Sequence, residues 1–282
     1  MDILSEQGGL VEALNAKVYG NGTQTLVLSH GYGSDQTVWH YLLPYLACYF
    51  KVVVFDLAFS ANVNPDFYNP KKYSNFDSYA HDLLCLLDQL NVKKTIYLGH
   101  SMSAMIGCIA ATKRPELFES LILLGGSPRY LNAKRYYGGF QKSDLETIFK
   151  EMNQDFPTWV HNFAPKAIYV NNKTAVTEYE RSLGRMKPQI ALSAARTVFL
   201  SDYRRVLPQV QVPCTIIQSK KDPSVPKSVA FYMKRKLGGH ARVKILETEG
   251  HFPHLTAYPL LLDVLKRALP IKYSISSNAI DP

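Results

Sequence analysis

Residues 95–103 read Thr95-Ile96-Tyr97-Leu98-Gly99-His100-Ser101-Met102-Ser103 and join a short apolar run to a helical pattern over residues 104–111. This order of strand, tight turn and helix is typical of a nucleophile elbow, a sharp turn that presents a serine hydroxyl. The turn is crowded, so it needs small residues two positions before and two after the serine. Gly99 and Ser103 meet that need, although glycine is commoner than serine at the second position. The stretch predicts that Ser101 is a nucleophile at the end of a buried strand.

Short β-rich runs surround this turn and alternate with helical patterns. Continuous runs of Val, Ile and Leu are typical of parallel strands that are buried on both faces, with helices as crossovers. The sequence therefore predicts an α/β fold, a mostly parallel twisted sheet with helices on both faces. The six runs are Thr25–Ser29, Lys51–Phe55, Thr95–Leu98, Ser120–Leu124, Cys214–Gln218 and Arg242–Leu246. We also expect Lys17–Tyr19 to pair antiparallel with the first run, because Asn21-Gly22 favours a tight hairpin turn.

The alternation stops after Pro128 and resumes near Val212. Between them, residues 129–199 have the pattern of helices broken by Pro157, Pro165 and Pro188. This segment holds 11 of the 33 aromatic residues, and aromatic rings either line an apolar cavity or pack such helices on each other. We assign residues 1–128 and 200–270 to a core, residues 129–199 to a helical lid inserted in it, and residues 271–282 to a flexible tail.

The composition excludes several classes of protein. The chain has 282 residues, 46% of them hydrophobic, which is enough for a large core. Its net charge of +9 comes from scattered residues without a nucleic-acid motif, so we expect no nucleic-acid binding. No apolar run approaches the roughly 18 residues that cross a bilayer, and Met1–Glu6 does not resemble a signal segment, so we expect no membrane association and a cytoplasmic and nuclear location.

The sequence shows no cofactor site. The residues contain no phosphate-binding loop, no dinucleotide-binding glycine pattern and no cluster with metal-ligand spacing, so we expect neither a cofactor nor a metal. The four cysteines are far apart and form no CxxC pair, which favours buried reduced thiols over disulfides. They are Cys48, Cys85, Cys108 and Cys214.

Two later strand ends supply partners for the serine. Asp222 follows the run Cys214–Gln218, and His251 follows the last run across a turn that ends in glycine. Because parallel strands end at the same sheet edge, we expect Ser101, Asp222 and His251 to meet as a catalytic triad. His251 would take the serine proton and Asp222 would orient the imidazole. His254 is the rival base, but it lies where a helix begins and lacks a preceding glycine.

An oxyanion hole needs two backbone N–H groups close to the serine. The first is expected from Met102, directly after the nucleophile, and the second from Tyr32 in the loop His30-Gly31-Tyr32-Gly33. The glycines of this loop let the backbone approach a substrate. We interpret His30 and His100 as structural neighbours of the site rather than as catalysts.

Several segments together resemble a known family, the plant α/β-hydrolase receptors for karrikins and strigolactones, called the karrikin-insensitive-two and dwarf-fourteen group. The resemblance extends over nearly the whole chain. The segments are Ser29–Gln36, Gly99–Met105, Ser127–Asn132, Gly138–Phe140, Phe163–Pro165 and Phe199–Asp202. Tyr130 looks more like the karrikin type, whereas Leu131-Asn132 fits the strigolactone type equally well.

The resemblance implies an α/β-hydrolase fold with a V-shaped four-helix lid over a deep apolar pocket. It implies slow hydrolysis of a butenolide lactone by a monomer, and signalling through a leucine-rich-repeat F-box protein and a transcriptional repressor. Matched by position, the triad is again Ser101, Asp222 and His251. The matched pocket walls are Tyr32, Tyr130, Phe140, Ile148, Trp159, Phe163 and Phe199.

Two positions depart from the family pattern. Phe59 stands in a turn where small residues are usual, and we expect it to alter the surface shape or a partner-binding edge. Pro223 follows Asp222 directly, and we expect it to affect the shape of the pocket.

The main alternative function is an ordinary carboxylesterase or lactonase with a small apolar metabolic substrate. A binding protein with a vestigial triad is a third hypothesis, which the intact triad disfavours.

Overall fold

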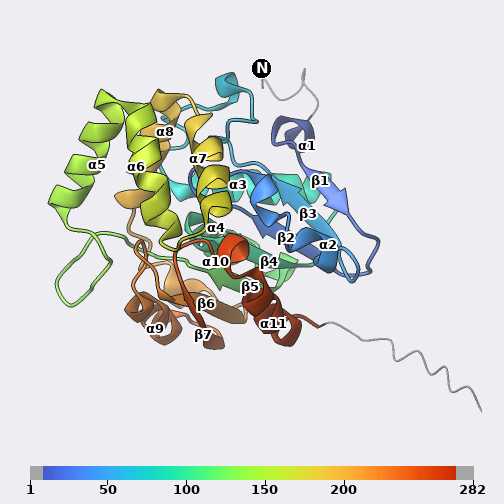
Figure 1. Cartoon of the computed structure of the whole chain (residues 1–282). Helices are drawn as coiled ribbons and strands as arrows, with labels where there is room; N and C mark the ends of the chain where they lie inside the picture. The colour runs from blue at the N-terminus through green and yellow to red at the C-terminus, as the bar shows by residue number, and fades with distance from the viewer. Residues whose placement is uncertain (1–8, 271–282) are drawn as a thin grey trace, which may run out of the picture.

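A mixed sheet lies at the centre of the molecule (Figure 1). The computed structural model describes residues 9–270, so the predicted tail at 271–282 lies outside the described residues. Within this range seven strands form one sheet in the order β1-β3-β2-β4-β5-β6-β7. They are β1 (Lys17–Tyr19), β2 (Thr25–Ser29), β3 (Lys51–Phe55), β4 (Thr95–His100), β5 (Phe118–Leu124), β6 (Cys214–Lys221) and β7 (Ala241–Glu249). All neighbouring pairs except β1 and β3 are parallel, which confirms the predicted sheet.

The central strands are buried, as their apolar sequences require. Every residue of β4 is buried, and so are the last four residues of both β2 and β3. The apolar runs predicted the bounds of β2 and β3, but β4 to β7 extend further because the hydrogen-bond ladder continues through polar residues such as His100 and Ser219. The extended carboxyl ends of β4, β6 and β7 adjoin the candidate site, whereas β5 extends at its opposite end.

The first strand pairs differently from the prediction. Strand β1 lies antiparallel to β3, with Lys17 opposite Val54, and does not pair with β2. Both edges of β2 are already taken by parallel neighbours, β3 and β4. Gly20 has a φ of +74°, and a Cβ there would lie 2.2 Å from the carbonyl oxygen of Ala47. The glycine therefore carries the chain closely past another loop, and no hairpin forms.

Short and long helices flank the sheet. Helices α3 and α4 pack on each other, α4 also contacts β4 and β5, α9 packs on β6 and β7, and α11 packs on β7. The helices outside the segment 129–199 are α1 (Leu10–Ala13), α2 (Leu43–Leu46), α3 (Phe76–Gln89), α4 (Met102–Lys113), α9 (Lys227–Lys236), α10 (Pro253–Thr256) and α11 (Tyr258–Ala268), with 3₁₀ turns η2 (Gln36–Trp39), η3 (Pro65–Phe67), η4 (Pro115–Leu117) and η5 (Leu207–Gln209).

Four consecutive helices lie between β5 and β6 and gather on one side of the molecule (green to yellow in Figure 1). They are α5 (Lys142–Gln154), α6 (Phe156–Ile168), α7 (Lys173–Gly184) and α8 (Pro188–Phe199), which we call the helical insert. Pro157 and Pro188 stand in the first turns of α6 and α8, where a proline is tolerated. The expected break at Pro165 is wrong, because α6 continues through it for three further residues. Residues 129–141, expected to be helical, form a loop instead.

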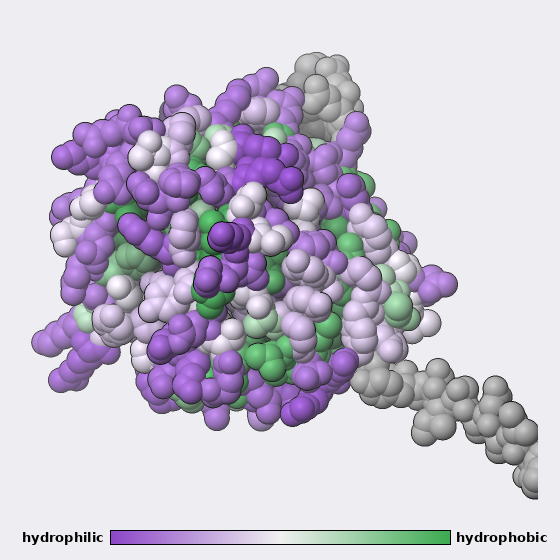
Figure 2. Space-filling model, in the orientation of Figure 1, coloured by the Kyte–Doolittle hydropathy of each residue, from purple (hydrophilic) through white to green (hydrophobic). Residues whose placement is uncertain are grey.

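The surface is mostly hydrophilic in the view of Figure 2, where hydrophobic residues form separate small areas.

Cys108 and Cys214 are buried thiols, as expected, but Cys48 is exposed and Cys85 is only partly buried. Within residues 9–270, no helix combines the length and the apolar character that a membrane crossing requires.

We predict opposite results for two helical Gly→Ala substitutions. An added Cβ at Gly107 in α4 would lie 2.3 Å from Cε1 of the buried Tyr97 ring, whose hydroxyl donates to the Ser103 carbonyl at 2.9 Å. Gly107→Ala should lower the free energy of unfolding by roughly 1–3 kcal/mol, because the pinned ring cannot yield.

Gly184 is the matched control, since its added Cβ would meet only Val160 Cγ1 at an ordinary 3.6 Å. Gly184→Ala should be neutral or stabilise by up to about 1 kcal/mol. Chemical denaturation of both variants measures the difference. A Gly107→Ala variant as stable as the wild type would contradict the close packing of α4 on β4.

Candidate active site

Ser101 stands at the turn between β4 and α4 in a strained backbone conformation. Its φ is 57° and its ψ is −121°, an unusual combination for a residue with a side chain. The Ser101 N–H donates to the Leu124 carbonyl of β5 at 2.8 Å, which fixes the turn to the sheet. A Cβ at Gly99 would lie 2.4 Å from the Ser103 carbonyl oxygen. The turn therefore has the shape of a nucleophile elbow.

Ser103 has a structural role at the elbow. Its hydroxyl donates to the carbonyl of His30 at 2.5 Å and accepts from the Ser29 hydroxyl at 3.0 Å. The side chain thus ties α4 to the end of β2, next to the loop that starts at His30. A glycine at this position could not make these bonds, which explains why serine occupies it here.

The structure brings the three predicted triad residues together. The Ser101 hydroxyl lies 2.8 Å from His251 Nε2, and His251 Nδ1 lies 2.8 Å from Asp222 Oδ2. Because the Asp222 carboxylate accepts a hydrogen bond from the N–H at Nδ1, the lone pair of the neutral imidazole is at Nε2, facing the serine. The chain order of serine, acid and histidine follows from β4, β6 and β7 ending at the same sheet edge.

Asp222 is held by hydrogen bonds from its own loop and from the preceding strand β6. Its Oδ1 accepts from the N–H groups of Ser224 at 2.8 Å and Val225 at 3.0 Å, and its Oδ2 also accepts from Gln218 Nε2 at 3.0 Å. The side chain is 1% exposed, so these donors replace the water that a carboxylate would otherwise bind. The carboxylate is therefore fixed as an acceptor for the histidine.

His254 does not reach the serine. It lies in α10, and burial among His251 and His40 lowers its pKa to about 3. Its ring packs against Trp39, with centroids 4.8 Å apart, and against His100 at 4.4 Å. The structure thus places His251, and not its rival, in position to act as the base.

His30 and His100 support the backbone around the site. His100 Nε2 donates to the carbonyl of His251 at 2.8 Å. His30 Nε2 accepts from the Leu57 N–H at 2.9 Å, and its Nδ1 donates to the Gly31 carbonyl at 2.9 Å. Burial lowers the pKa of both imidazoles, so both are neutral. Neither contacts the serine hydroxyl.

The two expected oxyanion donors are available. Neither Tyr32 N–H nor Met102 N–H has a hydrogen-bond partner within residues 9–270. Gly31 lets the loop His30–Gly33 approach the elbow closely, since an added Cβ at Gly31 would lie 3.0 Å from Ser101 Cβ. Met102 is the first residue of α4, so its N–H has no partner inside the helix.

A small cavity of about 20 Å³ adjoins the serine. Of the expected pocket walls, Tyr32, Tyr130, Phe163 and Phe199 line it. Tyr130 does more than line the cavity, because its hydroxyl lies 3.3 Å from Ser101 Oγ. Burial raises the pKa of this phenol, which is therefore neutral. The sequence did not indicate the other lining residues, Ala167, Tyr179, Val198, Ser224 and Phe252, although Phe252 directly follows His251.

The remaining expected walls line a second, larger cavity of about 260 Å³. Phe140, Ile148 and Trp159 belong to this cavity only, while Phe163, Ala167 and Ser224 belong to both. Glu151 and Lys166 add charges to its wall, and Pro223 completes it beside Asp222. The seven expected residues therefore line two adjacent cavities and not a single one.

Comparisons with known proteins agree with this geometry. Residues 24–258 match the family described as alpha/beta hydrolase fold. The chain is 47% identical to strigolactone esterase D14 of Arabidopsis thaliana, covering 94% of this chain and 99% of that protein. It is 44% identical to karrikin insensitive 2 receptor IA of Petunia hybrida, covering 96% and 98%. A solved hydrolase from Oleispira antarctica superposes with a TM-score of 0.89 at 30% identity, covering 92% and 95%.

The chain belongs to the α/β-hydrolase family. Within that family it groups with the plant strigolactone esterases and karrikin receptors. The fold, the strained serine and the hydrogen-bonded histidine and aspartate make it a serine hydrolase.

Phe59 of this hydrolase is not a surface residue, so the expectation that it alters surface shape or a partner-binding edge is wrong. Its side chain is 1% exposed. Its ring centroid lies 5.8 Å from that of His30, and 6.0 Å from those of Tyr32 and Tyr79. The bulky ring fills space beneath the loop that carries the oxyanion donor, where it supports Tyr32.

We predict that this hydrolase depends on His251 and not on His254. His251→Ala should lower the turnover of a chromogenic ester by at least about a thousandfold, because the serine loses its proton acceptor. His254→Ala should lower the melting temperature, since a buried ring is removed, but should keep most of the turnover. Steady-state kinetics with a parallel melting curve separate the two effects. Reversed kinetic results would assign the base to His254.

Proposed function

We propose that this hydrolase is a butenolide hormone receptor, of the karrikin or strigolactone type, that hydrolyses its ligand slowly at Ser101. One observation carries the proposal: relatives named strigolactone esterase and karrikin receptor are 44–47% identical to the chain over at least 92% of its length. The hydrogen-bonded triad supports the hydrolytic part of the proposal.

The proposed reaction begins at the serine hydroxyl. Its proton passes to His251 Nε2 while Ser101 Oγ attacks the carbonyl carbon of the lactone or ester, and Asp222 stabilises the imidazolium. The N–H groups of Tyr32 and Met102 stabilise the oxyanion that forms. When the carbon–oxygen bond breaks, the proton passes from His251 to the leaving oxygen. Water then releases the acyl group by the same steps.

The hydroxyl of Tyr130 contributes to the proposed slow rate of hydrolysis. Ser101 donates its proton to His251, so the neutral phenol donates to Ser101 Oγ. A donor on this oxygen withdraws electron density from the nucleophile, and its ring occupies space that a substrate needs. In this proposal the ligand displaces the Tyr130 hydroxyl from Ser101 Oγ before the serine attacks.

The two cavities support a compact apolar ligand. Aromatic and aliphatic side chains form most of the walls, and within the described residues no cationic side chain lines the cavity at Ser101. A ligand carboxylate would lose its hydration there without gaining a cationic partner. Compact lactones and esters fit the site better than charged acyl groups.

A leucine-rich-repeat F-box protein and a transcriptional repressor are the proposed signalling partners of a monomeric receptor. The named receptors among the relatives support this choice. Signalling to a repressor of transcription places the protein in the nucleus as well as the cytoplasm in this proposal. The helical insert is the proposed lid that changes its surface when ligand is bound.

The first test replaces the nucleophile. Ser101→Ala should lower hydrolysis of a chromogenic butenolide ester by at least about a thousandfold, because only binding and the oxyanion donors remain. Its melting temperature should stay close to that of the wild type. Turnover near the wild-type rate would overturn the proposed hydrolysis at Ser101. A wild-type rate of roughly ten per second or more would favour a metabolic esterase over a receptor.

The second test measures the response of the proposed lid. Hydrogen exchange with and without a butenolide should change mainly in residues 129–199 and around 222–227, while the central strands stay unchanged. Helices joined by short turns bury less continuous core than the sheet, so they open at lower free energy. Ligand shifts this opening only through different affinities for the two forms. Equal changes throughout the chain, or none in the insert at saturation, would contradict the receptor mechanism.

A further inference from the structure

The loop that carries the Tyr32 N–H is packed between the elbow and the helical insert. On one side, an added Cβ at Gly31 would lie 2.8 Å from His100 Nδ1. On the other side, an added Cβ at Gly33 would lie 2.9 Å from both Leu183 Cδ1 and the Tyr179 hydroxyl of α7. Glycine at both positions lets the loop touch two parts of the protein at once. A shift of α7 would therefore move the oxyanion loop.

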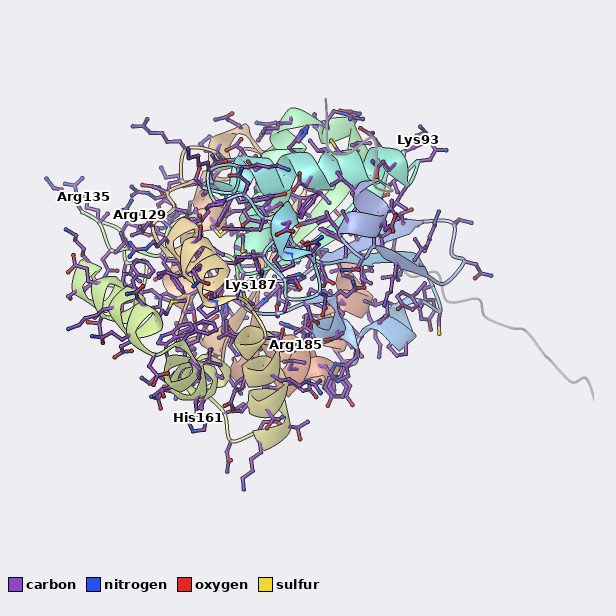
Figure 3. The ribbon with its side chains drawn as sticks, turned by 90° about the horizontal axis from the view of Figure 1, so that it is seen from above. Lys93, Arg129, Arg135, His161, Arg185 and Lys187 are labelled. Atoms are coloured by element: carbon purple, nitrogen blue, oxygen red, sulfur yellow. The ribbon has the colours of Figure 1, made fainter. Side chains whose placement is uncertain are left out.

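Asp35 forms the polar part of this contact. Its Oδ1 accepts from the Thr37 N–H at 2.9 Å and so begins the turn η2 in the core. Its Oδ2 accepts from Arg185 Nη2 at 2.7 Å and from the Ser182 hydroxyl at 3.3 Å. One carboxylate thus joins the end of the oxyanion loop to α7. Figure 3 labels Arg185 where the end of α7 meets the core.

Tyr32 itself is held by the insert through two further hydrogen bonds. Its carbonyl accepts from the Tyr179 hydroxyl of α7 at 3.3 Å. Its own hydroxyl donates to the Ala191 carbonyl of α8 at 3.0 Å. Both the backbone and the side chain of the oxyanion residue are therefore attached to insert helices.

We propose that Arg185 is a positioning residue, whose ion pair with Asp35 holds α7 against the oxyanion loop and keeps the Tyr32 N–H aimed at the reacting carbonyl. This inference rests on the proposed hydrolysis at Ser101. Within the described residues, Arg185 does not line the cavity at Ser101 and makes no hydrogen bond to Ser101, Asp222 or His251. Its removal weakens stabilisation of the oxyanion and leaves ground-state binding in place.

The asymmetry of burial makes the pair sensitive to loss of the arginine. The Asp35 side chain is 3% exposed, whereas that of Arg185 is 49% exposed. Without Arg185, Asp35 Oδ2 keeps only the Ser182 hydroxyl as a protein partner, so a single hydrogen bond of 3.3 Å remains between this carboxylate and α7. Arg185 directly follows α7, and replacing an exposed arginine ordinarily costs little, so a loss of rate on its removal would come from this ion pair.

The test compares Arg185→Gln with Arg181→Gln in the full chain. Arg181 lies one turn earlier on α7, is exposed and lines the same surface groove, but forms no ion pair within residues 9–270. Three quantities are measured: kcat and KM for a chromogenic short-chain ester, inhibition by a trifluoromethyl ketone, and binding of a non-hydrolysable ether analogue. The ketone forms a hemiketal oxyanion on the serine, whereas the ether probes the ground state alone.

Arg185→Gln should lower kcat by about tenfold, a part of the hundredfold or more that loss of an oxyanion donor costs. KM and ether binding should stay within about twofold, and inhibition by the ketone should weaken by the same factor as kcat/KM. Arg185→Lys should restore part of the rate, and Arg181→Gln should match the wild type.

Two outcomes would overturn the inference. An Arg185→Gln variant with a lower melting temperature but unchanged kcat would show a purely structural contact. Equal losses in kcat/KM, ketone inhibition and ether binding would show general damage to the site. Ser101→Ala distinguishes these results from failure of the proposed function, because hydrolysis that survives in that variant removes the proposed function itself.

Discussion

The left-handed backbone of Ser101 is the constraint on which the rest of the active site depends. A residue with a side chain in this conformation costs on the order of 1–3 kcal/mol, and the surrounding packing must supply that energy. The Ser101 N–H donates to β5, and its carbonyl accepts from the Ala104 N–H of α4 at 3.0 Å. Hydrogen bonds to a strand and a helix therefore hold the strained residue on both sides. Gly126 lets β5 end against α4, since an added Cβ would lie 2.3 Å from Ala104 Cβ. The buried sheet thus determines where the nucleophile points.

Much of the fold and the triad could be predicted because they depend on local patterns. The apolar runs are short and flanked by turns, which identifies buried parallel strands, and Asp222 and His251 each follow a strand. The pairing of β1 could not be predicted in this way, because it depends on which edge of the sheet remains open. The continuation of α6 through Pro165 could not be predicted either, because a proline inside a helix ordinarily breaks it and here the neighbouring Ala164, Ala167 and Ile168 are buried by tertiary packing.

The site residues that sequence reasoning missed reach the serine from distant parts of the chain. Tyr179 is one aromatic residue on an amphipathic helix, and nothing in its sequence shows that this face meets the oxyanion loop. The role of Arg185 depends likewise on a partner 150 residues away. Phe59 was misinterpreted for the same reason, because a bulky residue in a turn is buried or exposed according to tertiary packing.

The helical insert contacts two parts of the catalytic machinery, the backbone of His251 and the oxyanion loop. The His251 N–H donates to the Ala167 carbonyl near the end of α6 at 3.0 Å. An added Cβ at Gly250, just before this histidine, would lie 2.1 Å from the Ile168 carbonyl oxygen. Tyr130 reaches the serine from the loop that precedes the insert, and α7 reaches the oxyanion loop. A movement of the insert therefore cannot leave the catalytic geometry unchanged.

This arrangement connects slow turnover with signalling in the proposed receptor. The cavity at Ser101 has a volume of about 20 Å³, while its neighbour has about 260 Å³. Phe163 and Ala167 of α6 line both cavities, so a butenolide that occupied both would contact this helix. In the proposed receptor such a ligand displaces α6, which also holds the His251 backbone. Binding energy spent on moving this helix is not available to lower the reaction barrier. The same displacement that slows hydrolysis changes the outer surface of the insert, so a receptor built this way trades catalytic rate for a change that a partner can recognise.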